Sequence, residues 1–258
     1  MKKLSIVIPA YNEEQRIIKT LNEYYEFFNN KFKNDFEIIV IVNGSTDKTI
    51  EIVKTFSKKN KNLIYKDIKE KIGKGGAILE GFKIAQGSLI GFVDADLATS
   101  PKSFYDLIDK INDYDGIIAS RWMKGSKINI KQPLLKRIGS RGFNFLIRIL
   151  FGLNFKDTQC GAKLFKKQVI KDVLEDLTIT RWAFDVNLIY SVLKKKYKIK
   201  EIPTEWNAVK ASHFNLFKAI PEMALGLLRL RLVYSPFKFI VKIYDKLPGF
   251  LKLNHYLK

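Results

Sequence analysis

Two aspartates one residue apart, Asp94 and Asp96, follow directly after the apolar run Leu89–Val93. Carboxylates at the end of a strand can converge on one hard divalent cation such as Mg²⁺ or Mn²⁺. That cation would bridge the phosphates of a nucleotide sugar and neutralise a departing diphosphate, which is Lewis-acid catalysis. Acidic pairs also cap helices, and Pro101 suits the first position of a helix close behind, so the pair alone leaves both roles open.

Polar segments follow three other apolar runs along the first half of the chain. Residues 9–14 (PAYNEE) follow the first run, residues 43–47 (NGSTD) the second, and Lys74 with two glycines the third. Bare backbone amides beside a cation at a helix start suit a phosphate, although the spacing is not that of a P-loop. Ser45 or Thr46 could also serve as helix N-caps, a structural role that is compatible with ligand binding.

Short β-branched runs alternate with helical patterns over the first 120 residues. The runs expected to be strands are Leu4–Ile8, Phe36–Val42, Asn62–Lys66, Leu89–Val93 and Gly116–Ala119. The patterns expected to be helices are Glu13–Phe28, Thr46–Phe56, Gly75–Ala85 and Pro101–Ile111. This alternation predicts an α/β fold with a mostly parallel sheet and helices on both faces. Ligands of such sheets bind at the carboxyl ends of the strands, where the polar segments should meet.

Beyond residue 120 the pattern loosens. Residues 121–133 read as a polar loop, residues 134–153 and 184–194 as helices, and residues 199–202 as a strand. Two amphipathic helical patterns follow, the second with a basic stripe.

The apolar positions of these two patterns are Leu216, Ile220, Met223, Leu227 and Leu230, then Phe237, Ile240, Tyr244 and Leu247; the stripe is Lys238, Lys242 and Lys246. A basic stripe beside an aromatic-rich apolar face is typical of a helix lying in a lipid interface. The alternative is that these helices pack against the core of the protein. For the first pattern, neither interpretation is favoured over the other.

The net charge of +20 is concentrated in two segments. Residues 1–118 hold 18 basic and 17 acidic residues, whereas residues 119–171 hold 13 basic residues and one acidic residue. Residues 209–258 hold nine basic and two acidic residues. So uneven a distribution indicates a polyanion or an anionic surface as the partner of these two segments, with solvated surface lysines as the plain alternative.

Several classes of protein are disfavoured by composition and motif. The single cysteine, Cys160, excludes an internal disulfide framework. The start of the chain faintly imitates a signal peptide but reads as a first strand, and no stretch of 18 uncharged apolar residues predicts a membrane-spanning helix. Net charge alone permits nucleic-acid binding, but we find no nucleic-acid motif, and the basic segments do not interleave stacking aromatics.

Taken together, these motifs give the chain a resemblance to a known family. It resembles the family 2 inverting glycosyltransferases of the Rossmann-like GT-A fold. Within them it looks most like the dolichyl-phosphate β-glucosyltransferases, with polyprenyl-phosphate mannosyltransferases as nearby relatives. The segments that carry the resemblance are IVIPAYNEEQRI, NGSTDKT, GKGGAILEGF, DADLATSP, SRW, DTQCGAKLF and RWAFDVNLIY. DTQCGAKLF and RWAFDVNLIY are far more specific than any Asp-x-Asp pair.

The resemblance implies roles on the donor side. The residues expected to bind the nucleotide sugar are Pro9, Ala10, Tyr11, Glu13, Asn43, Lys74 and Asp94, and those expected to bind Mg²⁺ or Mn²⁺ are Asp94 and Asp96. Many relatives have an acidic residue at the position of Asn43. The amide oxygen of asparagine can still accept a hydrogen bond from a base N–H, but it carries no negative charge. Ala98 stands where mannosyl-type relatives offer a glutamine to the metal, which favours the glucosyl type and leaves a third ligand unidentified, His213 being one candidate.

The resemblance also implies roles on the acceptor side. Arg121, Arg137 and Arg141 lie where the family places residues that grip the acceptor phosphate, whose oxygens match guanidinium forks. Asp185 aligns with the base of hydroxyl-using relatives, so Asp185 and Asp96 are the expected catalytic residues. A phosphomonoester, with its second pKa at about 6, is largely dianionic at neutral pH and needs little help from a base. Asp185 would therefore act as a base, orient the acceptor, or merely be a helix-start charge.

We therefore expect a hexosyltransferase that moves glucose from UDP-glucose to dolichyl or polyprenyl phosphate, peripherally bound at an anionic membrane surface on its cytoplasmic face, with no nucleic-acid partner. GDP-mannose as donor, a glycan hydroxyl as acceptor, and a non-enzymatic nucleotide- or nucleic-acid-binding protein are the alternatives. The catalytic domain would span residues 1–208, with a nucleotide-binding half 1–120 and an acceptor half 121–208. A basic amphipathic membrane-interface segment would follow over residues 209–258.

Overall fold

A computed structural model describes residues 2–130, 134–178, 183–207 and 216–246 of the 258-residue chain. Its centre is a sheet of seven strands in the order β3-β2-β1-β4-β7-β5-β8. These strands are β1 (Leu4–Ala10), β2 (Phe36–Asn43), β3 (Leu63–Ile68), β4 (Leu89–Phe92), β5 (Gly116–Ser120), β7 (Lys163–Lys166) and β8 (Ile199–Pro203). All neighbouring strands are parallel except at β7, which runs antiparallel to both β4 and β5.

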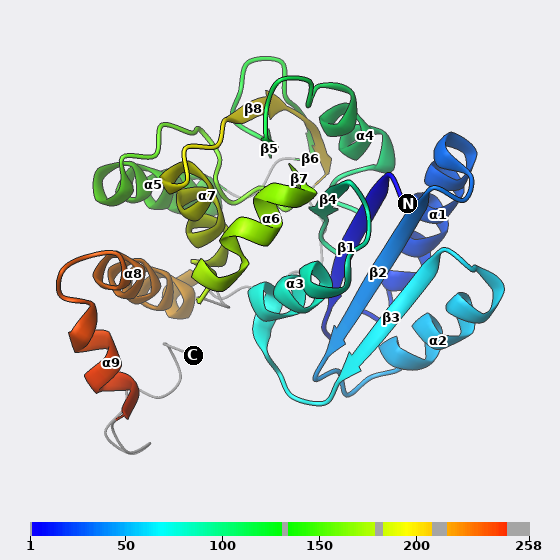
Figure 1. Cartoon of the computed structure of the whole chain (residues 1–258), viewed down its shortest axis with the longest axis horizontal. Helices are drawn as coiled ribbons and strands as arrows, with labels where there is room; N and C mark the ends of the chain where they lie inside the picture. The colour runs from blue at the N-terminus through cyan, green and yellow to red at the C-terminus, as the bar shows by residue number, and fades with distance from the viewer. Residues whose placement is uncertain (1, 131–133, 179–182, 208–215, 247–258) are drawn as a thin grey trace.

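Helices cover the sheet, and Figure 1 shows how they surround it. They are α1 (Ile17–Phe32), α2 (Thr49–Lys59), α3 (Gly73–Ile84), α4 (Pro101–Asp109), α5 (Leu134–Phe151), α6 (Lys167–Val173), α7 (Phe184–Lys194), α8 (Leu216–Val233) and α9 (Lys238–Lys246) among the described residues, with a short 3₁₀ turn at Leu174–Asp176. The predicted α/β fold with a mostly parallel sheet is confirmed.

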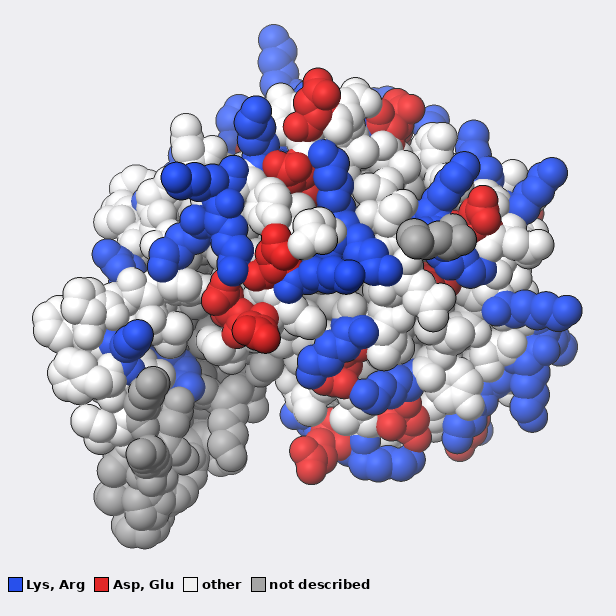
Figure 2. Space-filling view, viewed as in Figure 1, with Lys and Arg blue, Asp and Glu red and all other residues white. Residues whose placement is uncertain are grey.

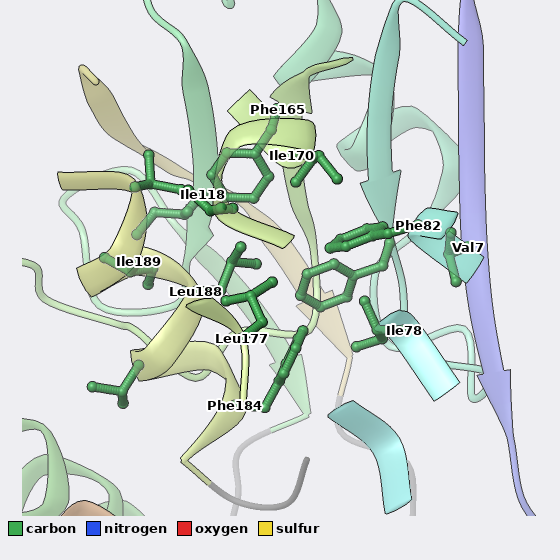
Figure 3. Packing of buried hydrophobic residues seen from close by; sticks show 14 of the residues in the cluster. Val7, Ile78, Phe82, Ile118, Phe165, Ile170, Leu177, Phe184, Leu188 and Ile189 are labelled. Atoms are coloured by element: carbon green, nitrogen blue, oxygen red, sulfur yellow. The ribbon is translucent and has the colours of Figure 1, made fainter. Parts of the chain in front are cut away.

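Alternation along the strands divides the core between the two faces of the sheet. In β1, Ile6 and Ile8 pack with the buried residues of α1 and α4, whereas Val7 belongs to the cluster on the other face. Figure 3 shows that second cluster, in which Phe184 of α7 lies beside Ile78 of α3. Because successive side chains of a strand point to opposite faces, strands buried on both sides must be apolar throughout, as β1 and β2 nearly are.

Three helices begin away from their predicted first residues. α1 begins at Ile17 instead of Glu13, because the backbone N–H of Glu13 donates to Thr49 Oγ1 and holds the preceding turn outside the helix. α2 begins at Thr49, so neither Ser45 nor Thr46 is its N-cap, and that alternative is wrong. α3 begins at Gly73, two residues earlier than predicted.

The prediction of an irregular loop over residues 121–133 is also wrong in part. Within it β6 (Lys127–Ile130) pairs in parallel with β9 (Glu205–Asn207), a two-stranded sheet apart from the main one. The short strand β7 was not predicted at all. Four residues, two of them lysines, give too little alternation to reveal a strand.

The C-terminal helices lie at the far end of the molecule from β2 and β3 (Figure 1). Leu227 and Leu230 of α8 are fully buried and join the core cluster that contains α5 and α7, so this part of α8 follows the core-packing alternative. α9 exposes Phe239, Ile240 and Ile243. Among the described residues, no helix combines the length and the apolar character needed to cross a membrane.

Candidate active site

The segments that follow β1, β2 and β4 meet the start of α3 around one open pocket of about 290 Å³. The residues that line it are Pro9, Tyr11, Glu13, Asn43, Lys71, Gly73, Lys74, Asp94, Ala95 and Asp96. β1, β2 and β4 are parallel neighbours, so their carboxyl ends lie at one edge of the sheet. The polar segments that were far apart in the sequence are therefore brought together there, as predicted.

Hydrogen bonds tie the segment after β1 to the segment after β2. The backbone N–H of Asn12 donates to Ser45 Oγ at 3.1 Å, and Asn12 Oδ1 accepts from the backbone N–H of Thr46 at 2.8 Å. Asn12 holds a left-handed backbone conformation with φ of 53°, which asparagine tolerates better than most residues. Ser45 and Thr46 thus join the two pocket-lining segments instead of capping a helix.

Asp94 is held between a lysine and a glycine. Lys74 Nζ in the first turn of α3 lies 2.6 Å from Asp94 Oδ1. Gly161 lies so close that an added Cβ would stand 1.9 Å from Asp94 Oδ2. The carboxylate therefore lies in contact with the cation on one side and is packed against the bare glycine on the other.

Asp96 lies in the turn after β4 and is half-buried. Its Oδ1 accepts from the backbone N–H of Ala98 at 3.0 Å, and burial, with the nearby Asp94 charge, raises its pKa. The helix behind it has its own cap, because Ser100 Oγ accepts from the backbone N–H of Ser103. Neither aspartate caps α4, so the capping role left open by the sequence is excluded.

Carboxylates crowd together around the two aspartates, and their charges act on one another. Burial raises the pKa of Glu13, against the lowering effect of Arg16, and the charges of Asp96 and Asp94 raise it further. Burial tends to lower the pKa of Lys74, but Asp94 above all raises it well beyond its usual value, so this ammonium stays charged. Carboxylates crowded in this way are the ligands that a hard divalent cation prefers.

The aspartates supply two carboxylates and no complete protein cage. The described residues contain no group of three or more His, Cys, Asp or Glu side chains arranged around a metal position. Mg²⁺ is commonly held by one or two carboxylates together with phosphate oxygens and water, and two aspartates at a phosphate pocket suit that mode. His213, the proposed third ligand, lies outside the described residues.

Asn43, at the end of β2, carries an unsatisfied acceptor and is separated by β1 from the aspartates that follow β4. Its side chain is 2% exposed, and its Nδ2 donates to the backbone carbonyl of Ala10 at 3.0 Å. Within the described part of the chain, its Oδ1 has no hydrogen-bond partner. A buried acceptor without a partner costs about 1–3 kcal/mol, so this oxygen is suited to receive an N–H from a ligand.

Two of the three arginines expected on the acceptor side lie around one indole ring. Arg121 is bound by Asp157, with Nε at 2.6 Å and Nη2 at 2.9 Å from its carboxylate oxygens. The guanidinium carbon of Arg141, exposed on α5, lies 5.1 Å from the ring centroid of Trp122, and that of Arg121 lies 5.9 Å from it. The side chain of Arg137 lies outside the described part of α5.

Asp185 forms a buried ion pair in the first turn of α7. Its Oδ1 lies 2.5 Å from Lys163 Nζ, and that ammonium also donates to the backbone carbonyl of Cys160 at 2.7 Å. The Lys163 side chain is fully buried. Asp185 is thus engaged by the Lys163 side chain instead of lining the pocket.

Comparison with known proteins identifies the family. The family model described as glycosyl transferase family 2 matches residues 5–174. The chain belongs to glycosyl transferase family 2. Two curated relatives are both named dolichyl-phosphate beta-glucosyltransferase: that of Dictyostelium discoideum is 35% identical over 243 residues, and that of Saccharomyces cerevisiae is 32% identical over 250 residues. Each alignment covers 90% of this chain, with 74% and 75% of the respective relative.

Solved structures support the fold of this family 2 glycosyltransferase. Glucosyl-3-phosphoglycerate synthase from Mycobacterium tuberculosis, in complex with Mn²⁺, UDP and phosphoglyceric acid, superposes with a TM-score of 0.63 at 15% identity, over 90% of this chain and 78% of that one. The same enzyme in complex with Mg²⁺ and UDP gives a TM-score of 0.62 over the same shares. At this identity the likeness shows the fold alone.

The family 2 glycosyltransferase places most of its predicted donor-side residues in one pocket. Ala10 is the exception: its side chain is buried in the core, and only its carbonyl reaches Asn43. Arg121, Arg141 and Asp185 lie outside the pocket lining, and their acceptor-side roles stay predictions, as does that of Arg137.

Sequence reasoning missed four residues that shape the site. Asp157, Gly161 and Lys163 all lie within DTQCGAKLF, whose specificity was noted without assigning these positions. No signal in the sequence could have found Lys163, because the short strand β7 that buries it could not be predicted. Lys71 lines the pocket but stands in a lysine-rich stretch, where no pattern distinguishes it.

Proposed function

We propose that this family 2 glycosyltransferase transfers glucose from UDP-glucose to dolichyl phosphate or a related polyprenyl phosphate, with Mg²⁺ or Mn²⁺. The names of the curated relatives support the sugar and the acceptor. The observation that carries the proposal is the pocket in which the unsatisfied Asn43 Oδ1, the Lys74 ammonium and the two aspartates line one cavity. The Asn43 oxygen suits a base N–H, the Lys74 ammonium suits a diphosphate, and the two aspartates suit a divalent cation.

On the donor side, Asn43 Oδ1 would accept the imide N–H of uracil, since its amide nitrogen is already committed to Ala10. The ring of Tyr11, 39% exposed at the pocket, offers a face for the base or ribose. Lys74, fixed by Asp94, stands where it can also contact a diphosphate oxygen. These groups are preorganised, so little reorganisation is needed when the donor binds.

Asp94 and Asp96 are the residues that would hold the cation. A bound Mg²⁺ or Mn²⁺ supplies Lewis-acid neutralisation of the diphosphate leaving group. The crowding of Glu13, Asp94 and Asp96, with Glu13 and Asp96 raised in pKa chiefly by burial, fits a site that gains from an added positive charge. Gly161 holds Asp94 in place for that purpose.

On the acceptor side, the phosphate oxygen would attack the anomeric carbon in line with the departing diphosphate. Because a phosphomonoester is largely dianionic at neutral pH, no strong base is required. Asp185, paired with Lys163, is better suited to orienting neighbouring groups than to removing a proton. Arg141, exposed beside Trp122, is the arginine whose fork is open to an anionic head group, whereas Asp157 already occupies two donors of Arg121.

The acceptor is a lipid, and we propose that the C-terminal helices bring the enzyme to an anionic membrane surface on its cytoplasmic side. Large apolar side chains there are between 45% and 59% exposed: Leu228, Phe237, Phe239, Ile240 and Ile243. Figure 2 shows a mainly uncharged surface where the described residues of α8 and α9 lie. The excess of seven positive charges in residues 209–258 supplies attraction to anionic lipids.

The test is a panel of UDP-glucose, GDP-mannose and UDP-N-acetylglucosamine, each offered with dolichyl phosphate and Mn²⁺ or Mg²⁺. Extraction into organic solvent separates lipid-linked sugar from unused donor. We expect lipid-linked glucose from UDP-glucose. Transfer of mannose alone would move the protein to the mannosyl type, and transfer to glycan hydroxyls without lipid product would contradict the proposed acceptor.

A further inference from the structure

The order of the strands sets the direction in which a donor would extend. Under the proposed function, the base meets Asn43 after β2 and the diphosphate meets the cation at Asp94 and Asp96 after β4. The next strand in the sheet is β7, which runs antiparallel to β4 and therefore begins at the edge where β4 ends. Because the sugar follows the diphosphate, it would lie beyond the aspartates, where the chain enters β7.

The segment that enters β7, residues 157–161, connects the two sides of the site. At one end Gly161 is packed against the Asp94 carboxylate, since an added Cβ would stand 1.9 Å from its Oδ2. At the other end the Asp157 carboxylate binds Arg121, which directly follows β5. This segment therefore spans the space between an aspartate of the donor side and an arginine expected on the acceptor side.

Hydrogen bonds hold the backbone of this segment but leave one buried donor unused. The Thr158 hydroxyl donates to Asn144 Oδ1 at 3.1 Å, and the backbone N–H of Gln159 donates to Asp157 Oδ1 at 3.2 Å. The side chain of Gln159 is half-buried, and its Nε2 atom is buried. Among the described residues, this amide nitrogen has no hydrogen-bond partner. Gln159 is thus held by its backbone while its carboxamide nitrogen lacks an acceptor.

The chemistry of the unused donor indicates which part of a ligand would satisfy it. Buried polar groups are nearly always hydrogen-bonded, so an unpaired N–H is suited to receive a ligand oxygen. A carboxamide is neutral and offers two N–H donors and one acceptor, which suits hydroxyl groups, whereas phosphate oxygens are bound more strongly by cations. We propose that Gln159 is a specificity-determining residue for the donor sugar, whose buried amide nitrogen donates to a hydroxyl oxygen of the hexose.

This proposal rests on the proposed function in that a nucleotide sugar must bind the pocket. Its test compares Gln159→Leu with the wild-type chain, because leucine is of similar size and removes the amide. Gln86→Leu is the matched control, since Gln86 is exposed and precedes β4 at the opposite edge of the sheet. Calorimetry with Mn²⁺ and without acceptor gives the affinities for UDP and UDP-glucose, and initial rates give KM for dolichyl phosphate.

Donor analogues that each lack one sugar hydroxyl identify the group that Gln159 contacts. In the wild-type chain, the analogue without that hydroxyl should bind about fivefold more weakly than UDP-glucose. Gln159→Leu should bind this analogue and UDP-glucose equally well, because the variant has already lost the same hydrogen bond. A variant that discriminates between every analogue and UDP-glucose as the wild type does would overturn the proposal.

We expect Gln159→Leu to weaken UDP-glucose binding about fivefold, as for the loss of one neutral hydrogen bond, and to leave UDP binding and KM for dolichyl phosphate unchanged. The unfolding temperature of the ligand-free variant should not fall, because the substitution removes an unpaired buried donor. Gln86→Leu should change none of the three binding measurements.

Four results would overturn the proposal. Equal weakening of UDP and UDP-glucose would assign the amide to the diphosphate, and a higher KM for dolichyl phosphate alone would assign it to the acceptor. A lower unfolding temperature would show a structural role, and unchanged UDP-glucose affinity would show no contact with the sugar. A wild-type chain that binds neither UDP nor UDP-glucose would instead contradict the proposed function, so the two failures are distinguishable.

Discussion

Replacing Gly161 by alanine should disable the site by displacing one carboxylate. The added Cβ would stand 1.9 Å from Asp94 Oδ2 and 2.4 Å from its Cγ. Real Cβ contacts essentially never fall below 3.0 Å, so the 1.9 Å contact must open by at least about 1.1 Å. The backbone of Gly161 is not left-handed, so alanine brings no strain of its own and the contact alone acts. The carboxylate would have to leave its present position, in which Oδ1 lies 2.6 Å from Lys74 Nζ.

A displacement of about 1 Å in a catalytic group costs about 100-fold in rate, which corresponds to about 2.7 kcal/mol in the activation free energy. We therefore expect Gly161→Ala to lower kcat/KM for glucosyl transfer by about 100-fold at saturating Mn²⁺. The measurement is initial-rate transfer from UDP-glucose to dolichyl phosphate, with circular dichroism to check that the chain is folded.

Gly142→Ala in α5 is the matched control, because a Cβ there would meet nothing within 4 Å. It should leave kcat/KM unchanged and raise the free energy of unfolding by up to about 1 kcal/mol, since alanine favours the helix. Activity of a folded Gly161→Ala enzyme within a factor of about three of wild type would refute the reasoning that this glycine positions Asp94.

Three further predictions concern the buried ion pairs and the tail. Lys163→Met should lower the free energy of unfolding, measured in urea, by about 3–5 kcal/mol, because it leaves Asp185 buried and unpaired. Adding Asp185→Leu to this variant should restore much of the lost free energy. If the effects of the two substitutions simply add in the double variant, the proposed coupling is contradicted. Burial raises the pKa of Asp157, but the charge and hydrogen bonds of Arg121 outweigh burial and hold that pKa below its usual range. The ion pair therefore stabilises the fold fully at pH values above the unfolded-state pKa of about 3.9. This stabilisation is lost as the pH falls through the lower pKa of the folded state. Asp157→Asn should therefore be less stable than wild type at pH 7 and lose less stability between about pH 4 and pH 2, as followed by urea titrations; parallel curves would argue against the assignment. Deleting residues 236–258 should lower the fraction of protein that sediments with anionic liposomes and should change the affinity for UDP much less. An unchanged sedimenting fraction would argue against the interfacial tail.

The fold of the first half could be predicted because its signals are local. β1 and β2 are buried, largely β-branched runs followed by polar residues, and parallel packing brings those polar ends to one edge. Asp94, Asn43 and Tyr11 therefore met in one pocket as expected. The pairing of β6 with β9 could not be predicted, since two strands of four and three residues far apart in sequence carry almost no periodicity.

The support of the site lies beyond sequence reasoning because it depends on contacts across the sheet. Gly161 lies against Asp94 only because β7 inserts beside β4, and this antiparallel insertion has no local signature. Lys71 faces Tyr11 because Gly44 turns tightly beneath it. For Arg121, the sequence shows a basic segment but not the buried Asp157 that binds two of its donors.

The central claim is that a divalent cation held by Asp94 and Asp96 activates the donor, and transfer of labelled glucose to dolichyl phosphate tests it most directly. The assay compares wild type and Asp96→Ala, each with Mn²⁺ and with excess chelator. We predict that only wild type with Mn²⁺ forms glycolipid, and that Asp96→Ala loses at least about 100-fold in rate while unfolding near the wild-type temperature. Equal transfer by wild type in chelator, or near-normal turnover by Asp96→Ala, would contradict the account.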